Sequence, residues 1–413
     1  MSIASTCQPA ANTSTRGSAS ARARARALFE REFGPLPASG AVAVHAPGRT
    51  ELAGNHTDHE GGRVMAGAIS AAIEGVAAPN GTDEVRVASE GYPGFSVSLA
   101  HLAPQPEERQ GTAALVRGMA AGLARTGREP QGFDLALAST IPAGGGLSSS
   151  AAVEAALGRT MELLWTGSDL DAVELARLAQ GVENEYFGKP CGLMDQLAVC
   201  LGGLSLMDFA NADRPSVARR DFDFAAAGYA LCLVDVGCDH TSFTAEYAAV
   251  AREMQQVAEV FGAERLCEVD RARFDARVPA LRARLGDRAV LRALHYWREN
   301  ELVDARWAAL AAGDMESFLA ATRASGASSA MYLQNVSAGG RYQPAMVALA
   351  LAERALAGRG AARIHGGGFG GSIQAFVPLE LLEDFAARMD GWLGAGACAT
   401  YTIAPEGACA TCL

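Results

Sequence analysis

The sequence contains almost no lysine. Of its 35 basic residues only Lys189 is a lysine, and the formal net charge at pH 7 is −11. A Walker-type phosphate loop carries a lysine inside it, so no loop of that type is expected. Proteins that bind nucleic acids usually present a basic face, which an acidic chain does not favour. We therefore expect small-molecule partners and no nucleic acid.

Long apolar runs are also lacking. No window of the sequence is apolar for long enough to span a bilayer, which predicts that the protein has no membrane partner. Residues 1–20 are rich in Ala, Ser and Thr and lack the hydrophobic segment of a secretory signal, so we interpret them as a disordered tail. A mitochondrial-type leader is the alternative, because Arg22, Arg24 and Arg26 continue a basic, acid-poor stretch.

Cysteine usage favours a cytoplasmic protein. The chain has nine cysteines, and an odd number without a signal peptide favours reduced thiols. Cys409 and Cys412 lie near the C-terminus and could share a metal ion, but an irregular tail is the favoured interpretation.

Apolar patterning predicts a mixed protein. Hydrophobic residues make up 49% of 413 positions, which is enough for two domains or one large two-lobed unit. Strands are expected at 42–44, 85–87, 95–99, 133–137, 231–236, 373–377 and 400–403. Helices are expected at 115–123, 151–165, 170–186, 247–261, 288–312 and 343–357. We predict an α+β protein with two lobes, divided into a tail at 1–20, a first domain at 21–210 and a second at 211–413.

The most informative stretch is the run Gly144, Gly145, Gly146, Leu147, Ser148, Ser149 and Ser150, between a predicted strand and a predicted helix. Glycines let the backbone approach a ligand closely, and a helix start offers N–H groups and a favourable dipole to an anion. The pattern indicates a phosphate-binding loop without a lysine. The alternatives are a flexible turn with a helix cap and a nucleophilic serine, although Gly-x-Ser-x-Gly is absent.

A second polar segment runs from residue 48 to 62. The side chains of Asn55, His56 and Asp58 can hydrogen-bond several hydroxyls of a sugar, and Arg49 can offset negative charge on a transferring phosphoryl group. A solvated loop is the alternative. A metal site that includes His59 is disfavoured, because the spacing fits no strong zinc signature.

Two carboxylates flank a Pro-Cys-Gly turn. Asp195 can act as a general base or merely cap a helix, and Glu183 is a candidate ligand for Mg²⁺. Residues 365–371 form a third glycine-rich stretch that is followed by a predicted strand rather than a helix, which argues against a dinucleotide site. We interpret it as a turn between two strands that packs closely, most simply against the first glycine loop.

In order and spacing, these segments resemble the GHMP kinase superfamily and, within it, the galactokinases. Residues 48–62 look like the galactokinase sugar signature, 142–152 like the ATP loop, 191–196 like the segment with the catalytic aspartate, and 365–371 like the third motif. The resemblance covers residues 41–377. It implies a two-lobed GHMP kinase fold with the active site in the cleft between an N-terminal and a C-terminal α/β domain.

The resemblance also implies ATP-dependent phosphorylation of galactose at the anomeric hydroxyl. Asp195 would take the hydroxyl proton, while Arg49 would hold Asp195 and stabilise the transition state. Residues 144–150 would hold the triphosphate, with Ser150 and Glu183 on Mg²⁺. Sugar contacts are expected from Asn55, His56, Thr57, Asp58, Gly192 and Tyr247. We expect a monomer or weak dimer.

Asn55 departs from the family pattern, because familiar galactokinases carry a sugar-binding glutamate there. Thr50 and Glu51 also replace a small apolar residue and an asparagine. Charge-assisted hydrogen bonds are worth about 1.5–3 kcal/mol against about 1 kcal/mol for neutral ones, so sugar affinity is expected to differ. Two alternatives stay open: a kinase for another galacto-configured sugar, such as galacturonate or N-acetylgalactosamine, and a sugar sensor without catalysis.

Overall fold

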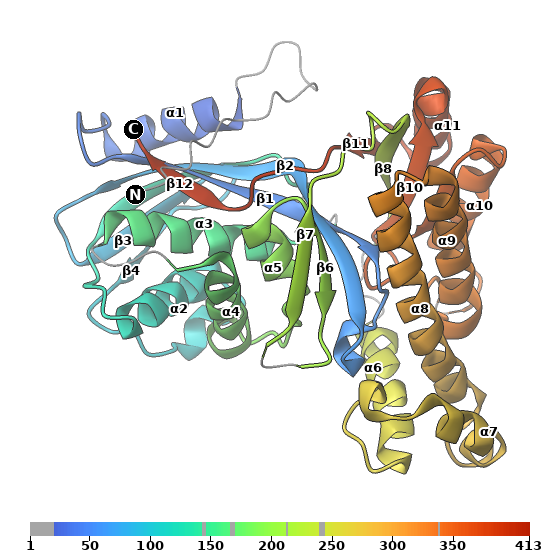
Figure 1. Cartoon of the computed structure of the whole chain (residues 1–413). Coiled ribbons are helices and arrows are strands. Elements are labelled where there is room, and N and C mark those ends of the chain that lie inside the picture. The colour runs from blue at the N-terminus through green and yellow to red at the C-terminus, as the bar shows by residue number, and fades with distance from the viewer. Residues whose placement is uncertain (1–19, 143–145, 166–169, 212–213, 239–243, 338) are drawn as a thin grey trace.

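The computed structural model describes residues 20–142, 146–165, 170–211, 214–238, 244–337 and 339–413, which form two sheets flanked by helices (Figure 1). The expected tail lies outside these residues except for Ser20, whose hydroxyl accepts a hydrogen bond from the Ala23 amide at the start of α1, Ala21–Phe33. Within these ranges no helix is long and apolar enough to cross a membrane.

The first sheet has eight strands in the order β12-β1-β2-β5-β3-β4, with β6 paired to β2 and β7 paired to β6. They are β1 Val42–Ala53, β2 Arg63–Pro79, β3 Glu84–Ser89, β4 Phe95–Ser98, β5 Phe133–Ser139, β6 Leu204–Asp208, β7 Ser216–Arg220 and β12 Cys409–Cys412. One face is covered by α2 Thr112–Arg125, α3 Ser149–Leu164, α4 Ala172–Val182 and α5 Met194–Leu201, and α1 covers the other (Figure 1).

The sequence pattern does not predict β2, and the burial of this strand explains why. Helix α1 packs on one face of β2 while α3 and α5 pack on the other, so residues on both faces are buried. A strand covered on both sides loses the alternation of apolar and polar residues. Small residues are also required locally, since a Cβ added at Gly75 would lie 2.6 Å from the side chain of Val44.

The second sheet has four strands in the order β11-β8-β10-β9, namely β8 Tyr229–Asp235, β9 Ala361–Ile364, β10 Ser372–Pro378 and β11 Cys398–Tyr401. The helices of this half are α6 Thr244–Val260, α7 Arg271–Leu285, α8 Asp287–Ala312, α9 Met315–Ser328, α10 Pro344–Leu356 and α11 Leu382–Leu393. A shared core joins the halves, with Leu52 and Met65 from the first sheet packed near Phe318 and Phe376 of the second half.

The last strand corrects two expectations. Residues 409–412 form β12, which pairs antiparallel with Val42–His45, so the expected irregular tail at Cys409 and Cys412 is wrong. Because β7 and β12 both belong to the first sheet, the division between the sheets does not fall at residue 211. The chain instead passes between the sheets twice, at 221–228 and at 402–408.

Candidate active site

Arg49 lies where strand β1, the glycine loop and helix α5 meet. Pro47 and Gly48 lie at an irregularity within β1, where the pairing with β2 shifts register. A Cβ added at Gly48 would lie 3.0 Å from the carbonyl oxygen of Leu147, so only glycine lets the loop approach this closely. The Arg49 amide donates to the same carbonyl at 3.2 Å.

The Arg49 guanidinium is bound on three sides. Its Nε and Nη2 donate to Oδ1 and Oδ2 of Asp195 at 2.7 and 2.8 Å, and its Nη1 donates to the Gly146 carbonyl at 2.6 Å. A bidentate pair of this kind fixes the carboxylate in orientation as well as in position. Arg49 therefore couples the expected base to the expected phosphate loop.

Asp195 does not cap its helix. The capping position of α5 is Leu193, and Asp195 lies in the first turn with its carboxylate turned toward Arg49 and the Ser148 hydroxyl, which donates to Oδ2. Burial raises the pKa of Asp195. The Arg49 charge and the hydrogen bonds from Arg49 and Ser148 together outweigh this effect, so the pKa of Asp195 lies below its usual range. A third of the side chain is exposed (33%), which leaves the ionised carboxylate accessible to a substrate hydroxyl.

The described part of the phosphate loop runs directly into α3. Gly144 and Gly145 lie outside the described residues. Gly146 and Ser148 both have left-handed backbone angles, with φ of 69° and 56°, and α3 begins at Ser149. The first amides of a helix have no partner within the helix and attract anions, so the start of α3 stays the candidate phosphate site.

Glu183 lies opposite the start of α3. The expected continuous helix at 170–186 ends at Val182, and Glu183–Phe187 forms a wider π-helical turn. The buried Glu183 carboxylate accepts hydrogen bonds from Ser150 Oγ at 3.2 Å and from Gln196 Nε2 at 2.8 Å, and it pairs with Lys189 Nζ at 3.3 Å.

These groups fit a magnesium ion. Mg²⁺ prefers hard oxygen ligands and usually takes one or two carboxylates together with substrate phosphates. The Ser150 hydroxyl and the Glu183 carboxylate offer such oxygens beside the phosphate loop. No group of three or more His, Cys, Asp or Glu side chains forms a metal cage within the part of the chain that the structure describes.

Two neighbours of Glu183 are not predicted from the sequence. Gln196 is fully buried and also donates to Glu154 Oε2 at 3.3 Å. Burial, followed by the charge of Glu183, raises the pKa of Glu154 to about 9. Their positions in the sequence could have identified them as neighbours of the site. Glu154 lies one helical turn after Ser150, and Gln196 directly follows Asp195.

Four of the expected sugar contacts gather beside this centre. His56 Nε2 donates to the Gly367 carbonyl at 2.8 Å, and its ring lies 5.1 Å from that of Tyr247. Asp58 faces Gly192, where an added Cβ would lie 2.8 Å from Asp58 Oδ2. Partial burial, followed by the charges of Asp58 and Asp195, raises the pKa of Tyr247.

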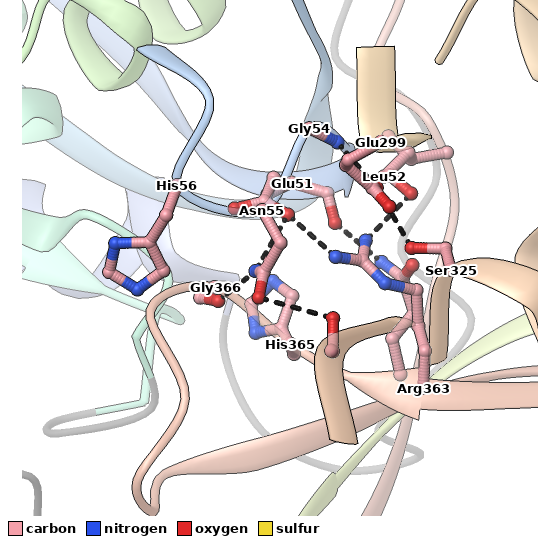
Figure 2. A network of polar contacts seen from close by, with 12 residues as sticks. Glu51, Leu52, Gly54, Asn55, His56, Glu299, Ser325, Arg363, His365 and Gly366 are labelled. Carbon is pink, nitrogen blue, oxygen red and sulfur yellow. Dashed lines mark hydrogen bonds and ion pairs between the residues drawn. The ribbon is translucent and has the colours of Figure 1, made fainter. Parts of the chain in front are cut away.

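His56 is held as a neutral imidazole. Burial, followed by the neighbouring His59, lowers the pKa of His56 to about 4. Since Nε2 donates to the Gly367 carbonyl, the proton lies on Nε2 and Nδ1 is left as an acceptor. The residue has a left-handed backbone (φ 58°), which turns its ring away from Asn55 (Figure 2).

Asn55 and Thr57 are buried and their polar side-chain atoms are bonded within the protein, which argues against the two expected sugar contacts. Asn55 is fully buried, and its amide nitrogen donates to Glu51 Oε1 at 3.2 Å and to the Gly366 carbonyl (Figure 2). Its side-chain oxygen accepts a hydrogen bond from Asn335 Nδ2 at 2.5 Å. Thr57 is also fully buried, and its hydroxyl lies 2.6 Å from the Arg63 carbonyl, where it closes the turn.

Asn55 belongs to a buried polar network between the two halves of the molecule (Figure 2). Arg363 of β9 pairs with Glu51 at 2.9 Å and donates to the Leu52 carbonyl at 2.8 Å. His295 Nε2 lies 2.9 Å from the Asn55 carbonyl oxygen. Burial is the largest influence on the pKa of Glu51 and raises it. The charge and hydrogen bond of Arg363, together with His365 and the hydrogen bond from Asn55, lower the pKa below its usual value, so the pair stays ionised.

A second ion pair extends the network into α8 and α9. Arg306 pairs with Glu299 at 2.9 Å, and the same Glu299 oxygen accepts hydrogen bonds from Ser325 at 2.8 Å and from the Gly54 amide at 3.1 Å (Figure 2). All of these side chains are fully buried. The network therefore fixes the end of β1, and with it the His56 segment, against the second half of the molecule.

The third glycine loop joins β9 to β10, as expected. The expected packing against the first glycine loop concerns Gly144 and Gly145, which lie outside the described residues. The third loop's carbonyls at Gly366 and Gly367 accept hydrogen bonds from Asn55 and His56. A Cβ added at Gly367 would lie 2.1 Å from the Tyr247 ring. Glycine is needed at position 367 so that the loop can lie close to Tyr247 while it binds the segment that carries Asn55 and His56.

Known proteins are similar to this chain in both sequence and fold. Residues 27–79 match a model described as the galactokinase galactose-binding signature, and residues 114–203 match the GHMP kinases N terminal domain. A galactokinase of Streptomyces coelicolor is 35% identical over 338 residues, which cover 80% of this chain and 83% of that protein. A galactokinase of Streptomyces lividans is 35% identical over 345 residues, 81% of this chain and 82% of the relative.

Solved structures agree with the expected architecture. Lactococcus lactis galactokinase complexed with galactose matches with a TM-score of 0.79 at 24% identity, over 94% of this chain and 98% of that one. Methanococcus jannaschii mevalonate kinase matches with a TM-score of 0.64 at 15% identity, over 89% of this chain and 99% of that one. The predicted α+β GHMP kinase fold is confirmed, and the chain belongs to the galactokinase family of the GHMP kinases.

Proposed function

We propose that the protein transfers the γ-phosphoryl group of ATP to the anomeric hydroxyl of galactose, which gives galactose 1-phosphate and ADP. The observation that carries this proposal is the position of Asp195. Its carboxylate is held by Arg49 and Ser148 at the phosphate loop, and Gly192, three residues before it, faces Asp58 of the expected sugar site. A phosphoryl acceptor and a phosphoryl donor can therefore meet at one carboxylate.

In the proposed mechanism Asp195 accepts the hydroxyl proton as the sugar oxygen attacks the γ-phosphorus. The low pKa of Asp195 does not prevent this role, because phosphoryl transfer has a loose transition state in which the proton leaves late. Arg49 fixes the carboxylate and stabilises the negative charge that spreads over the phosphoryl oxygens. Mg²⁺, held by Ser150 and Glu183, would neutralise charge on the phosphates.

We assign sugar recognition to four residues. The neutral His56 offers a hydrogen-bond acceptor and Asp58 offers a carboxylate. Tyr247, which is 44% exposed, places its ring beside His56. Gly192 provides room beside Asp58. Asn55 was the reason to consider another galacto-configured sugar, and its burial in the polar network removes that reason.

The test is a kinase assay with ATP, Mg²⁺ and a panel of sugars. We expect galactose to be phosphorylated with a higher kcat/KM than galacturonate or N-acetylgalactosamine, and the activity to be lost in Asp195→Asn. Binding of galactose without phosphorylation would support a sensor instead. We also propose a monomer or weak dimer in the cytoplasm, which light scattering and cell fractionation can check.

A further inference from the structure

Lys189 is the single lysine of the chain, and it lies beside the carboxylate that we assign to Mg²⁺. We propose that the Lys189 ammonium binds the terminal phosphates of the nucleotide and so supplies the cation that the glycine-serine loop lacks. This inference rests on the proposed function, because it concerns the same nucleotide site. In Walker-type loops a lysine within the loop reaches these phosphates, whereas here the lysine comes from another segment.

The backbone around Lys189 is fixed by Glu183 itself. The π-helical turn ends at Gly188, which has a left-handed backbone with φ of 83°. The amides of Gly188 and Lys189 both donate to the Glu183 carbonyl, at 3.0 and 3.1 Å. The side chain then returns to the Glu183 carboxylate, with Nζ 3.3 Å from Oε1.

The ammonium and the start of α3 converge on a single oxygen. Oε1 of Glu183 accepts a hydrogen bond from Ser150 Oγ at 3.2 Å as well as from Lys189. Ser150 lies in the first turn of α3, the anion-binding end of the helix. Lys189 is therefore a neighbour of the phosphate loop in space, although it lies in another segment of the chain.

The other cation of this centre is already committed. All three guanidinium nitrogens of Arg49 donate to Asp195 or to Gly146. Glu183 and Asp195 add negative charge, which opposes a triphosphate unless cations offset it. An ammonium has three donors, so Lys189 can contact Glu183 and still donate to phosphate oxygens.

Exposure and charge state both fit this role. The Lys189 side chain is 63% exposed, against 3% for Glu183, and an exposed ion pair of this kind contributes little to stability. An exposed lysine side chain carries a positive charge at neutral pH. A charged and accessible ammonium suits a ligand contact better than a structural one.

The first experiment measures nucleotide binding by calorimetry, with the non-hydrolysable ATP analogue AMP-PNP in the presence of Mg²⁺. We expect Lys189→Met to weaken the affinity for AMP-PNP about tenfold or more, as for the loss of a charge-assisted hydrogen bond, without changing the affinity for adenosine. Lys189→Arg should restore most of the loss. The control is Arg109→Met, since Arg109 lies against the same turn, 3.4 Å from a Cβ placed on Gly188.

The second experiment uses the fact that only one side chain of the protein is a primary amine. N-hydroxysuccinimidyl acetate should acetylate Lys189 and the N-terminal amine, and mass spectrometry can follow each. We expect AMP-PNP with Mg²⁺ to slow acetylation of Lys189 while the N-terminal amine reacts at its usual rate. Galactose alone should give no protection.

Three outcomes would overturn the inference. They are AMP-PNP affinity unchanged in Lys189→Met, an equal loss in Arg109→Met, or no protection of Lys189 by AMP-PNP. If Lys189→Met lowered the melting temperature and left AMP-PNP affinity unchanged, Lys189 would only stabilise the fold as the ion-pair partner of Glu183, and the inference would likewise be wrong. Failure of the wild-type protein to phosphorylate galactose would contradict the proposed function instead, and the protection experiment, which needs no turnover, would still decide the role of Lys189.

Discussion

Glu154 and Glu183 share one amide nitrogen, because Gln196 Nε2 donates to both carboxylates, at 3.3 and 2.8 Å. All three side chains are buried beside the phosphate loop. Two anions cannot both remain charged at such short range without a large energetic cost. The proton is therefore held on Glu154, whose pKa burial and Glu183 raise to about 9.

This arrangement predicts a pH-dependent stability. The pKa of Glu154 is higher in the folded state than its ordinary value of about 4.5, so the folded state binds a proton that the unfolded state releases. Stability should therefore fall as pH rises from about 5 to 9, by up to about 1.4 kcal/mol per pH unit. Glu154→Gln, which mimics the neutral acid, should flatten this slope. Urea unfolding at several pH values with EDTA measures it, and equal slopes in both proteins would contradict the assignment.

The Arg49–Asp195 pair predicts a specific kinetic defect. Arg49→Gln removes the charge and the three guanidinium hydrogen bonds, two to Asp195 and one to the Gly146 carbonyl. We expect kcat to fall about 100- to 1000-fold, as for the loss of a transition-state donor. Arg49→Lys keeps the charge but not the bidentate geometry, so a smaller loss is expected. Steady-state kinetics with saturating galactose measure both variants.

The same pair predicts a change in the pH profile. Asp195 must be ionised to act, and its low pKa keeps it ionised above about pH 5 in the wild-type protein, so kcat/KM should not fall there on its account. Arg49→Gln removes the two largest influences that oppose burial and leaves only the Ser148 hydrogen bond and the Lys189 charge, so the pKa of Asp195 rises and the acid limb moves to higher pH. An unmoved acid limb would show that Arg49 does not set this pKa.

Burial of Asn55 predicts a loss of stability rather than of sugar affinity. Asn55→Ala leaves Asn335 and the Gly366 carbonyl without their partner, and we expect unfolding to become easier by about 1–3 kcal/mol. The KM for galactose should change much less than in His56→Ala, which serves as the comparison. A large KM increase in Asn55→Ala with unchanged stability would place Asn55 in the sugar site after all.

The close contact between Gly367 and Tyr247 can be tested with a single methyl group. Gly367→Ala would bring a Cβ within 2.1 Å of the Tyr247 ring and displace it from His56, so we expect a higher KM for galactose with little change in stability. Gly366→Ala is the control, because a Cβ there meets nothing within 4 Å, although its φ of 59° costs about 1 kcal/mol of backbone strain. Equal KM increases in both variants would exclude the displacement of Tyr247 as the cause.

The motifs could be placed from the sequence because their residue types are informative locally. A glycine-serine run before a helix predicts an anion site wherever it occurs, and the structure does place Ser150 opposite Glu183. The orientation of Asn55 could not be predicted in this way. It depends on Asn335, Gly366 and His295, which lie far along the chain, and no local pattern shows where they meet.

Prediction of the fold from the sequence was limited in the same way, because local patterns do not report how elements are buried by distant parts of the chain. Strands with one exposed face were predictable from alternation, whereas β2 is buried on both faces and carries no such pattern. Asp195 looks like a helix cap in the sequence, and only the start of α5 one residue before it shows that the carboxylate is free to face Arg49.

Strand β12 bears on how the protein reaches its native state. It pairs residues 409–412 with residues 42–45, and in Figure 1 this segment runs back across the molecule to the edge of β1. Contacts between residues so distant in sequence slow folding, because a large loop must close before they form. Until residue 412 has been synthesised, the edge of β1 stays open, and open edges readily pair with other chains. We therefore expect the growing polypeptide to depend on chaperones until this final strand docks.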